Sequence, residues 1–283
     1  RALGQSFAGG VILGFATALP ETVLVISAIV LGLPDAAYSS VTGANAMLMT
    51  LGVGLLGSVY FALYRRPIVM EGRYSDEVIS LLAATAITLA YILLSPFLPN
   101  EVLRYVIGSA LIAIYAYYVY FNYREEAQGG KGGIDLLGAL MILAGGIIAV
   151  LLSPVFLGSL RDVSEGLNLP YALMVYFLTP IAAELEEKLS AYLIVFKSSS
   201  NGGLALYSFI GSKIQNSTVL VGLSLMFASS QCSACLAVLV ISNLFGAIVM
   251  RDGKLTPLES SVGIALYVIL SAFLGAYSGT SLP

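Results

Sequence analysis

Long apolar runs separated by short polar turns make up almost the whole chain. A helix needs roughly 20 residues to cross a hydrocarbon core about 30 Å thick. Turn residues, such as LPDA at 33–36 and SSSNGG at 198–203, divide the runs. The pattern predicts an all-α polytopic membrane protein with nine spans, at 4–32, 37–64, 77–96, 101–121, 135–158, 168–196, 203–227, 233–250 and 258–279.

The composition agrees with a chain that is surrounded by lipid. Of its 283 residues, 58% are hydrophobic and 10% are charged, whereas a soluble domain has about 25% charged residues. The net charge of −3 gives no indication of a nucleic-acid partner, and the lack of histidine excludes a His-ligated metal site. We expect membrane lipid around the chain and no cofactor. The oligomeric state stays open.

The basic residues predict how the spans are oriented. One set of alternate loops holds Arg65, Arg66, Arg73, Arg124, Lys131, Lys197, Arg251 and Lys254, and the other set holds Arg161, with Arg104 close by. Cytoplasmic loops carry an excess of Lys and Arg, so the first set is expected on the cytoplasmic side. Residue 1 then lies on that side and Pro283 outside, in a multi-pass protein for which the plasma membrane is the default location.

Six ionisable residues fall inside the predicted spans instead of in loops. They are Glu21, Glu184, Glu186, Glu187, Lys188 and Lys213. A charge at the bilayer centre costs at least about 2.5–3.5 kcal/mol on insertion scales, so such residues need partners or a water-filled cavity. We favour a functional site over the alternative, which is a purely structural network of buried ion pairs.

Proline precedes the intramembrane carboxylates in two long spans. Pro20 comes directly before Glu21, and Pro180 comes seven residues before Glu187. Because proline cannot donate a helical hydrogen bond, each span is expected to break into two half-helices near its middle. Secondary transporters bind ions at the membrane midplane with helices broken in this way.

A similar arrangement of residues occurs twice along the chain. Glu21 is followed by TGANAMLMTLGVG at 42–54, and Glu187 is followed by IGSKIQNSTVLVG at 210–222. The two copies start five spans apart, which is an odd number, so they are expected to have opposite membrane orientation. We predict an inverted-repeat transporter of 5+5 helices, whose first helix precedes this sequence. Its halves are residues 1–121 and 135–283, and 122–134 form a cytoplasmic linker.

These segments resemble the cation/calcium exchanger superfamily, which includes sodium/calcium and proton/calcium antiporters. FATALPE at 15–21 followed by TGAN at 42–45 is similar to that family's first α-repeat, which has a Gly-Thr-Ser-Leu-Pro-Glu helix and then a Gly-Ser-Asn helix. The resemblance implies that Glu21 is the first cation-binding carboxylate and that Thr17 offers its backbone carbonyl. It also places Asn45 at the site.

The second copy is closer to the proton/calcium branch. PIAAELEEK at 180–188 and GSKIQ at 211–215 are similar to that branch's Pro-Ile-Val-Gly-Asn-Ala-Ala-Glu-His and Gly-Ser-Ser-x-Gln motifs. The resemblance makes Glu187 the second cation-binding carboxylate, or Glu184 when the Leu-Pro-Glu form guides the alignment. The further ligands that it implies are the Ala183 carbonyl and the side chains of Ser212, Gln215 and Asn216.

Some positions depart from the family pattern. Sodium/calcium exchangers place Ser after the Thr of the broken helix, and Asn or Asp four residues beyond the Ser of Gly-Ser-Asn. This chain has Ala18 and Leu48 at those positions, so oxygen ligands for sodium are missing. Lys213 stands where the family has a neutral polar residue, and we expect it to neutralise Glu184 or Glu186 when the ion is absent.

The resemblance implies a secondary active antiporter that exchanges Ca²⁺, or a similar divalent cation, for H⁺ by alternating access. Calcium prefers six to eight oxygen ligands. Two facing carboxylates do not both stay ionised when the cation leaves, and this couples cation release to proton uptake. A sodium-coupled exchanger is the alternative in the same class. A non-transporting membrane scaffold is the alternative in another class.

An enzyme is not expected. Ser212 and Lys213 are the candidate hydrolase dyad, but neighbours on a helix diverge by about 100°. Cys232 and Cys235 form a C-x-x-C pair in a short loop, and the four ligands of a structural zinc site are not found nearby. We interpret these cysteines as two small residues without a special role, with a disulfide or redox pair as the alternative.

Overall fold

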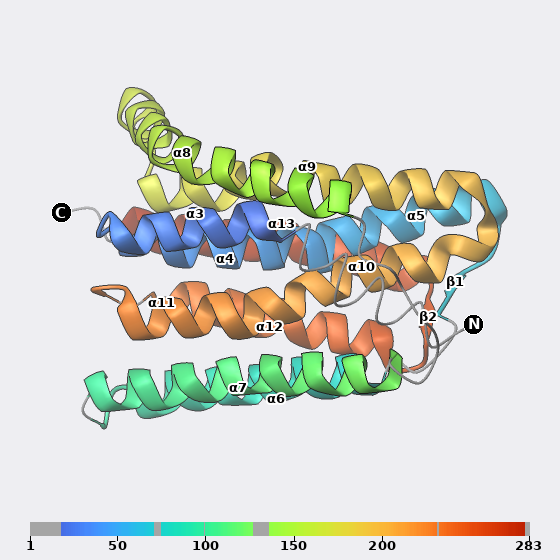
Figure 1. The fold of residues 1–283 in the computed structure, drawn as a ribbon, viewed down its shortest axis with the longest axis horizontal. Helices are drawn as coiled ribbons and strands as arrows, with labels where there is room; N and C mark the ends of the chain where they lie inside the picture. Colours follow the sequence, from blue (N-terminus) through green and yellow to red (C-terminus); the bar gives the residue numbers. More distant parts are fainter. Residues whose placement is uncertain (1–17, 71–74, 99, 127–135, 231, 281–283) are drawn as a thin grey trace.

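The computed structural model describes residues 18–70, 75–98, 100–126, 136–230 and 232–280. Most of these residues are helical, and most of the helix axes are roughly aligned (Figure 1). The helices are α3 (Leu19–Val30), α4 (Pro34–Ala46), the π-helix η2 (Met47–Gly52), α5 (Val53–Tyr64), α6 (Ser75–Leu94), α7 (Asn100–Glu126), α8 (Leu136–Leu167), α9 (Tyr171–Lys197), the 3₁₀-helix η3 (Ser199–Asn201), α10 (Gly202–Gln215), the π-helix η4 (Asn216–Leu220), α11 (Val221–Phe227), α12 (Ser233–Met250) and α13 (Pro257–Thr280). Two short strands, β1 (Ile68–Val69) and β2 (Lys254–Leu255), pair antiparallel.

The prediction of an all-α polytopic membrane protein is confirmed. Within the described residues, six helices are long and apolar enough to cross a membrane, and two shorter apolar helices accompany them. Helix α12 has the predicted bounds. Helix α8 was expected to end at 158 but continues to Leu167, where an exposed ion pair between Arg161 and Glu165, one turn apart, supports the helix beyond its apolar part. Helix α7 also continues, to Glu126, into the predicted linker.

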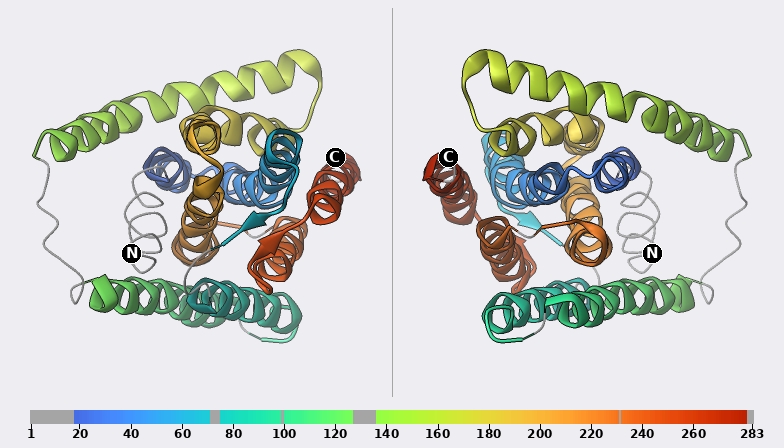
Figure 2. Two further views of the ribbon diagram at one scale, coloured as in Figure 1. Left: turned by 90° about the vertical axis from the view of Figure 1, so that its right-hand side faces the viewer. Right: turned by 90° about the vertical axis from the view of Figure 1, so that its left-hand side faces the viewer.

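The outer helices carry the apolar surface, and the inner helices carry buried polar groups. Figure 2 shows α8 on one side of the bundle and α6 with α7 on the opposite side, with α4, α9 and α10 between them. Large apolar side chains of the outer helices are exposed, for example Val155 and Val106. By contrast, Asn45 of α4 and Lys213 of α10 are fully buried. This polarity is expected for a protein whose outer surface faces lipid and whose site is internal.

Two helix modules run in opposite directions. In the first, α3 is followed by the continuous segment α4–η2–α5, and in the second, α9 is followed by α10–η4–α11. The Tyr38 hydroxyl near the start of α4 donates to the Ser224 carbonyl in α11 (3.2 Å), and the Tyr60 hydroxyl in α5 donates to the Ser199 carbonyl before α10 (2.7 Å). Each module therefore begins where the other ends. The 5+5 helix count remains a prediction.

Several basic loops gather at one end of the bundle. β1 follows α5 and β2 follows α12, and their pairing joins Ile68 to Leu255. The Arg66 guanidinium donates to the Ser199 hydroxyl at the end of α9 (2.5 Å). Loops that were predicted to lie on the same side of the membrane therefore lie at the same end of the helices.

The predicted break at Pro180 is wrong. Helix α9 is continuous from Tyr171 to Lys197, with Pro180 inside it. Proline at this position removes the hydrogen bond to the Tyr176 carbonyl, but neighbouring elements can compensate a freed carbonyl. Helix α4 passes so close to this carbonyl that a Cβ built on Gly43 would lie 2.2 Å from the Tyr176 oxygen. In the first module, α3 begins at Leu19 with Pro20 in its first turn, and the residues before Ala18 lie outside the described part.

The interpretation of Cys232 and Cys235 as two unlinked small residues is also wrong. The two cysteines form a disulfide, and their Cα atoms are 5.2 Å apart, within the range that a disulfide can bridge. Cys232 is the N-cap of α12, and its sulfur accepts the backbone N–H of Cys235 (3.2 Å). The start of a helix thus brings residues of this spacing together. The Thr42 hydroxyl of α4 donates to the Cys235 carbonyl (3.2 Å), which connects the disulfide-bonded turn to the core.

We expect Gly43→Ala to destabilise the protein. The added methyl group would clash with the Tyr176 backbone, which cannot rotate away, and would force α4 and α9 apart. Overpacking a core typically costs about 1–3 kcal/mol. Gly158→Ala in α8 is the matched control, because nothing lies within 4 Å of its added Cβ. Thermal unfolding in detergent measures both, and equal unfolding midpoints would contradict the close approach of α4 and α9.

Candidate functional site

Three buried carboxylates come from two helices of opposite direction. Glu21 lies in the first turn of α3, and Glu184 and Glu187 lie on α9. Each of the three residues is at most 2% exposed. Residues three apart on a helix share a face, so α9 presents both of its glutamates to the interior.

Lys213 of α10 connects these helices. Its side chain is fully buried, and its ammonium group lies 3.4 Å from Glu21 Oε2 and forms a second ion pair with Glu184 Oε1. Lys188 is bound to the other oxygen of Glu184 (3.2 Å) and to the Pro180 carbonyl (3.0 Å). The centre of the site is therefore a chain of carboxylates and ammonium groups shared by α3, α9 and α10.

Two neutral side chains donate hydrogen bonds to Glu21 and Glu187. The Asn216 amide donates to Glu21 Oε2 (2.6 Å), and the Ser212 hydroxyl donates to Glu187 Oε1 (2.8 Å). Asn216 is the first residue of the π-helix η4, and π-turns in α-helices often lie at functional sites because they change the direction of side chains. The corresponding segment of the first module also contains a π-helix, η2, just after Asn45.

Several oxygen atoms in this cluster are buried without a partner. Within the described residues, Glu21 Oε1, Glu187 Oε2 and Asn216 Oδ1 are solvent-inaccessible and accept no hydrogen bond. An unsatisfied buried acceptor is costly, and three of them on residues of this cluster fit a ligand that carries positive charge.

Two other predicted ligands are held by neighbouring polar side chains. The Asn45 amide donates to Ser217 Oγ (2.6 Å) and Asn243 Oδ1 (2.8 Å), and its own buried oxygen accepts no hydrogen bond within the described residues. The Gln215 amide donates to the Thr22 hydroxyl (3.1 Å), and its oxygen accepts the Tyr115 hydroxyl (3.2 Å).

For three further residues of the predicted site, the structure describes no side-chain contact with the cluster. Ala183 is buried inside continuous α9, where backbone carbonyls normally accept intrahelical bonds. Thr17 and the side chain of Glu186 lie outside the described residues.

Sequence reasoning missed three contributors. It identified Lys188 as an intramembrane charge but gave it no role, although its spacing of four residues from Glu184 is the one that pairs opposite charges on a helix. Thr22, next to Glu21, carries the contact to Gln215. Asn243 of α12 binds Asn45 and Ser217, and no local pattern marks it.

The Ser–Lys dyad of a hydrolase is not formed. The Ser212 hydroxyl donates to Glu187 and lies 3.1 Å from the Phe209 carbonyl, whereas the Lys213 ammonium group contacts Glu21 and Glu184. Lys213 is therefore not positioned to act as the general base that removes the Ser212 proton.

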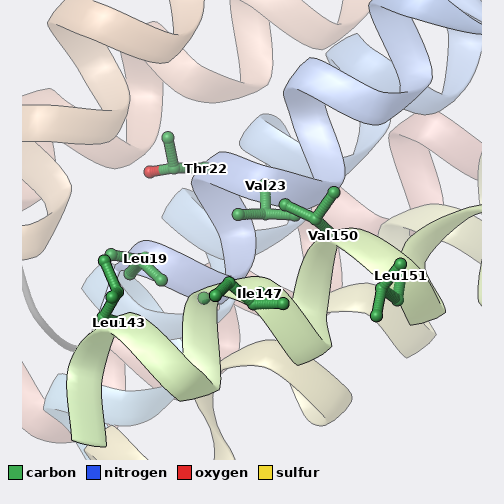
Figure 3. Close-up of a pocket in the computed structure, with 8 residues that line it drawn as sticks. Leu19, Thr22, Val23, Leu143, Ile147, Val150 and Leu151 are labelled. Carbon is green, nitrogen blue, oxygen red and sulfur yellow. The ribbon is translucent and has the colours of Figure 1, made fainter. Parts of the chain in front are cut away.

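A separate cavity of about 490 Å³ lies between α3 and α8. Its walls are leucine, valine and isoleucine side chains, the backbone of Gly146 and a single polar residue, Thr22 (Figure 3). These lining residues include no ionisable group, so this cavity does not suit a charged ligand.

The site is arranged to hold positive charge, and part of that charge belongs to the protein. Among the described residues, no three acidic, cysteine or histidine side chains are close enough to hold a metal ion in the observed arrangement. The reason is visible in the contacts, because Lys213 lies between the carboxylates of α3 and α9. An external cation at this point must replace some of these ion pairs.

The sequence matches a known protein family along almost its whole length. The family described as "Sodium/calcium exchanger protein" matches residues 1–124 and 137–275. These two stretches contain all the carboxylates of the site. No curated protein sequence matches the chain significantly.

Solved structures of exchangers share the fold. The structure of native YfkE aligns with a TM-score of 0.74 at 20% identity and covers 98% of this chain and 87% of that chain. The H⁺/Ca²⁺ exchanger CAX aligns with a TM-score of 0.70 at 16% identity, over 98% of this chain and 85% of its own. The sodium-calcium exchanger NCX_Mj, soaked with 2.5 mM Na⁺ and 10 mM Sr²⁺, aligns with a TM-score of 0.66 at 19% identity, over 95% and 86%. At these identities the likeness concerns the fold.

We expect Glu184→Gln to destabilise the protein more than Glu187→Gln. The first substitution removes the carboxylate that pairs with both Lys188 and Lys213, and breaking a buried pair typically costs about 3–5 kcal/mol. Glutamine at 187 keeps an oxygen that can accept the Ser212 hydroxyl, and Glu187 has no direct ion pair among the described side chains. Thermal unfolding of both variants in detergent, without added divalent cation, makes the comparison. A larger effect of Glu187→Gln would contradict the assignment of Glu184 as the central partner.

Proposed function

The chain belongs to the sodium/calcium exchanger protein family, and we propose that it is a secondary active antiporter that exchanges Ca²⁺, or a similar divalent cation, for H⁺ by alternating access. The family consists of transporters, so a role in catalysis is not proposed. The observation that carries this proposal is that Glu21 and Glu184, from oppositely directed helices, share the buried Lys213, with the buried Glu187 about one turn further along α9.

The chemistry of the site supports a hard cation as substrate. Calcium binds six to eight oxygens at about 2.3–2.6 Å, with carboxylates among them. Glu21, Glu187 and Asn216 each have a buried side-chain oxygen without a partner, and Ser212 lies next to Glu187. We assign these four residues, together with Glu184, as the cation-binding set. Asn45, Gln215, Thr17 and Ala183 remain proposed ligands.

Proton coupling is favoured by what the site lacks for sodium. Ala18 and Leu48 are buried apolar residues at positions where sodium/calcium exchangers carry oxygen ligands. When the divalent cation leaves, the carboxylates remain close together in a poorly hydrated interior. Proton uptake then removes the repulsion between their charges without needing further ligands. Sodium coupling is the second candidate, because NCX_Mj is a sodium-calcium exchanger of the same fold.

We also propose a plasma-membrane location with the C-terminus outside. The end of the bundle that contains Arg66, β1 and β2 is rich in basic residues, as cytoplasmic ends usually are. Helix α13 starts beside β2 at this end and continues toward the other.

In proteoliposomes, an imposed pH gradient is expected to drive ⁴⁵Ca²⁺ uptake by the wild-type protein. Glu21→Gln and Glu187→Gln should each lower the initial rate at least about 100-fold, because removal of a carboxylate ligand weakens both cation binding and proton exchange. Glu165→Gln is the matched control, since Glu165 is an exposed glutamate of α8 far from the buried cluster in sequence.

Each other outcome has a definite meaning. Uptake that persists in both buried variants would reject the assigned site. Uptake driven by a sodium gradient but not by a pH gradient would reject proton coupling in favour of sodium coupling. Complete absence of flux, with the protein folded and inserted, would favour the membrane scaffold.

A further inference from the structure

Lys213 occupies the place where the two halves of the site meet. Its ammonium group pairs with Glu21 on α3, in the first module, and with Glu184 on α9, in the second module. The side chain is fully buried, so bulk water does not reach this charge. A buried ammonium group needs carboxylates around it, and here the carboxylates are those of the proposed cation site.

The charges of the cluster nearly cancel without any external ion. The described cluster consists of three carboxylates, Glu21, Glu184 and Glu187, and two ammonium groups, Lys188 and Lys213. With all five groups ionised, one negative charge remains. A poorly hydrated site is stable only when its net charge is small, and a single monovalent cation would neutralise this one.

Lys213 and a divalent cation compete for the same oxygens. A bound Ca²⁺ needs oxygens at about 2.3–2.6 Å on all sides, and Glu21 Oε2 and Glu184 Oε1 cannot meet this requirement while they hold an ammonium group between them. Lys213 must therefore withdraw from at least one carboxylate when a divalent cation binds. Its four-carbon stem is flexible enough to allow this movement.

The two lysines differ in their freedom to act in this way. Lys188 forms its ion pair within its own helix, with Glu184 one turn before it (3.2 Å). It also contacts the Pro180 carbonyl (3.0 Å) and Met47 Sδ (3.3 Å), and its side chain is 19% exposed. Lys213 has ion pairs only to other helices. Lys213 is thus the charged group of the cluster that connects α3 to α9.

We propose that Lys213 is a tethered cation that takes the place of one coupling ion. The ammonium group and the divalent cation occupy Glu21 and Glu184 alternately. Each transport cycle therefore needs one free coupling cation fewer than it would without this lysine. The inference rests on the proposed antiport function and adds a residue that sets its stoichiometry.

The coupling ratio tests the inference. The membrane voltage is clamped at zero by K⁺ and valinomycin. The ratio of inside to outside Ca²⁺ concentration at which net flux stops is then measured for a series of concentration ratios of the coupling ion. The slope of this relation on logarithmic axes is the number of coupling cations per Ca²⁺. We expect about one for the wild type and about two for Lys213→Gln, because the variant lacks one fixed positive charge in a site that must stay near neutral.

Two controls separate charge from structure. Lys213→Arg keeps the positive charge and should keep the wild-type slope, even if its bulk slows transport. Lys197→Gln removes a positive charge from the exposed end of α9 and should leave both slope and rate unchanged. A structural role alone would lower the stability of Lys213→Gln without moving the slope.

The outcomes are distinguishable from a failure of the proposed function. If the wild type shows no gradient-driven Ca²⁺ flux, the antiport proposal itself fails. If the wild type exchanges Ca²⁺ and Lys213→Gln has the same slope, only the tethered-cation role is overturned. If the neutral variant does not fold, the wild-type slope decides, since a value of two or more contradicts the inference and a value of one supports it.

Discussion

The ion pairs of Lys213 with Glu21 and Glu184 are the interaction on which the interior of this protein depends. They join the start of α3 to the middle of α9 through α10, and they do so where neither lipid nor bulk water can solvate a charge. In isolation, each of these groups would be expensive to bury. Together with Lys188, Asn216 and Ser212 they compensate most of one another's cost. Removing any member leaves the others in an environment that was suitable only for the complete set.

The surrounding helices separate this buried cluster from the lipid. The polar residues of α4 and α10 face inward, and the apolar faces of α6, α7 and α8 form the outer surface. Contacts between helices at the centre are close because small residues lie there, as Gly43 does against the Tyr176 carbonyl. The two π-helices, η2 and η4, occupy matching places in the two modules. At the start of η4, Asn216 reaches Glu21, while its neighbour Gln215 in α10 contacts Thr22.

The sequence predicted most of the helices and singled out the buried charges of the candidate site, because both follow from the cost of placing polar groups in lipid. Long apolar runs mark the spans, and glutamates and lysines within them stand out against that background. Other features depend on contacts between distant segments. Helix α9 continues through Pro180 where α4 packs closely against it, the bonds of Asn45 involve Asn243 of α12, and the disulfide-bonded Cys232 is a helix N-cap. No local pattern carries this information.

The short pairing of β1 with β2 fastens the loop after α5 to the connection between α12 and α13, which itself packs against α5. β1 extends from α5 in the first module, and β2 connects α12 to α13 after the second. Any rocking motion that separated the loops at this end would have to break the ladder, whereas a motion that opened the opposite end could leave it intact. The strands therefore resist separation of α5 from the α12–α13 connection at this end.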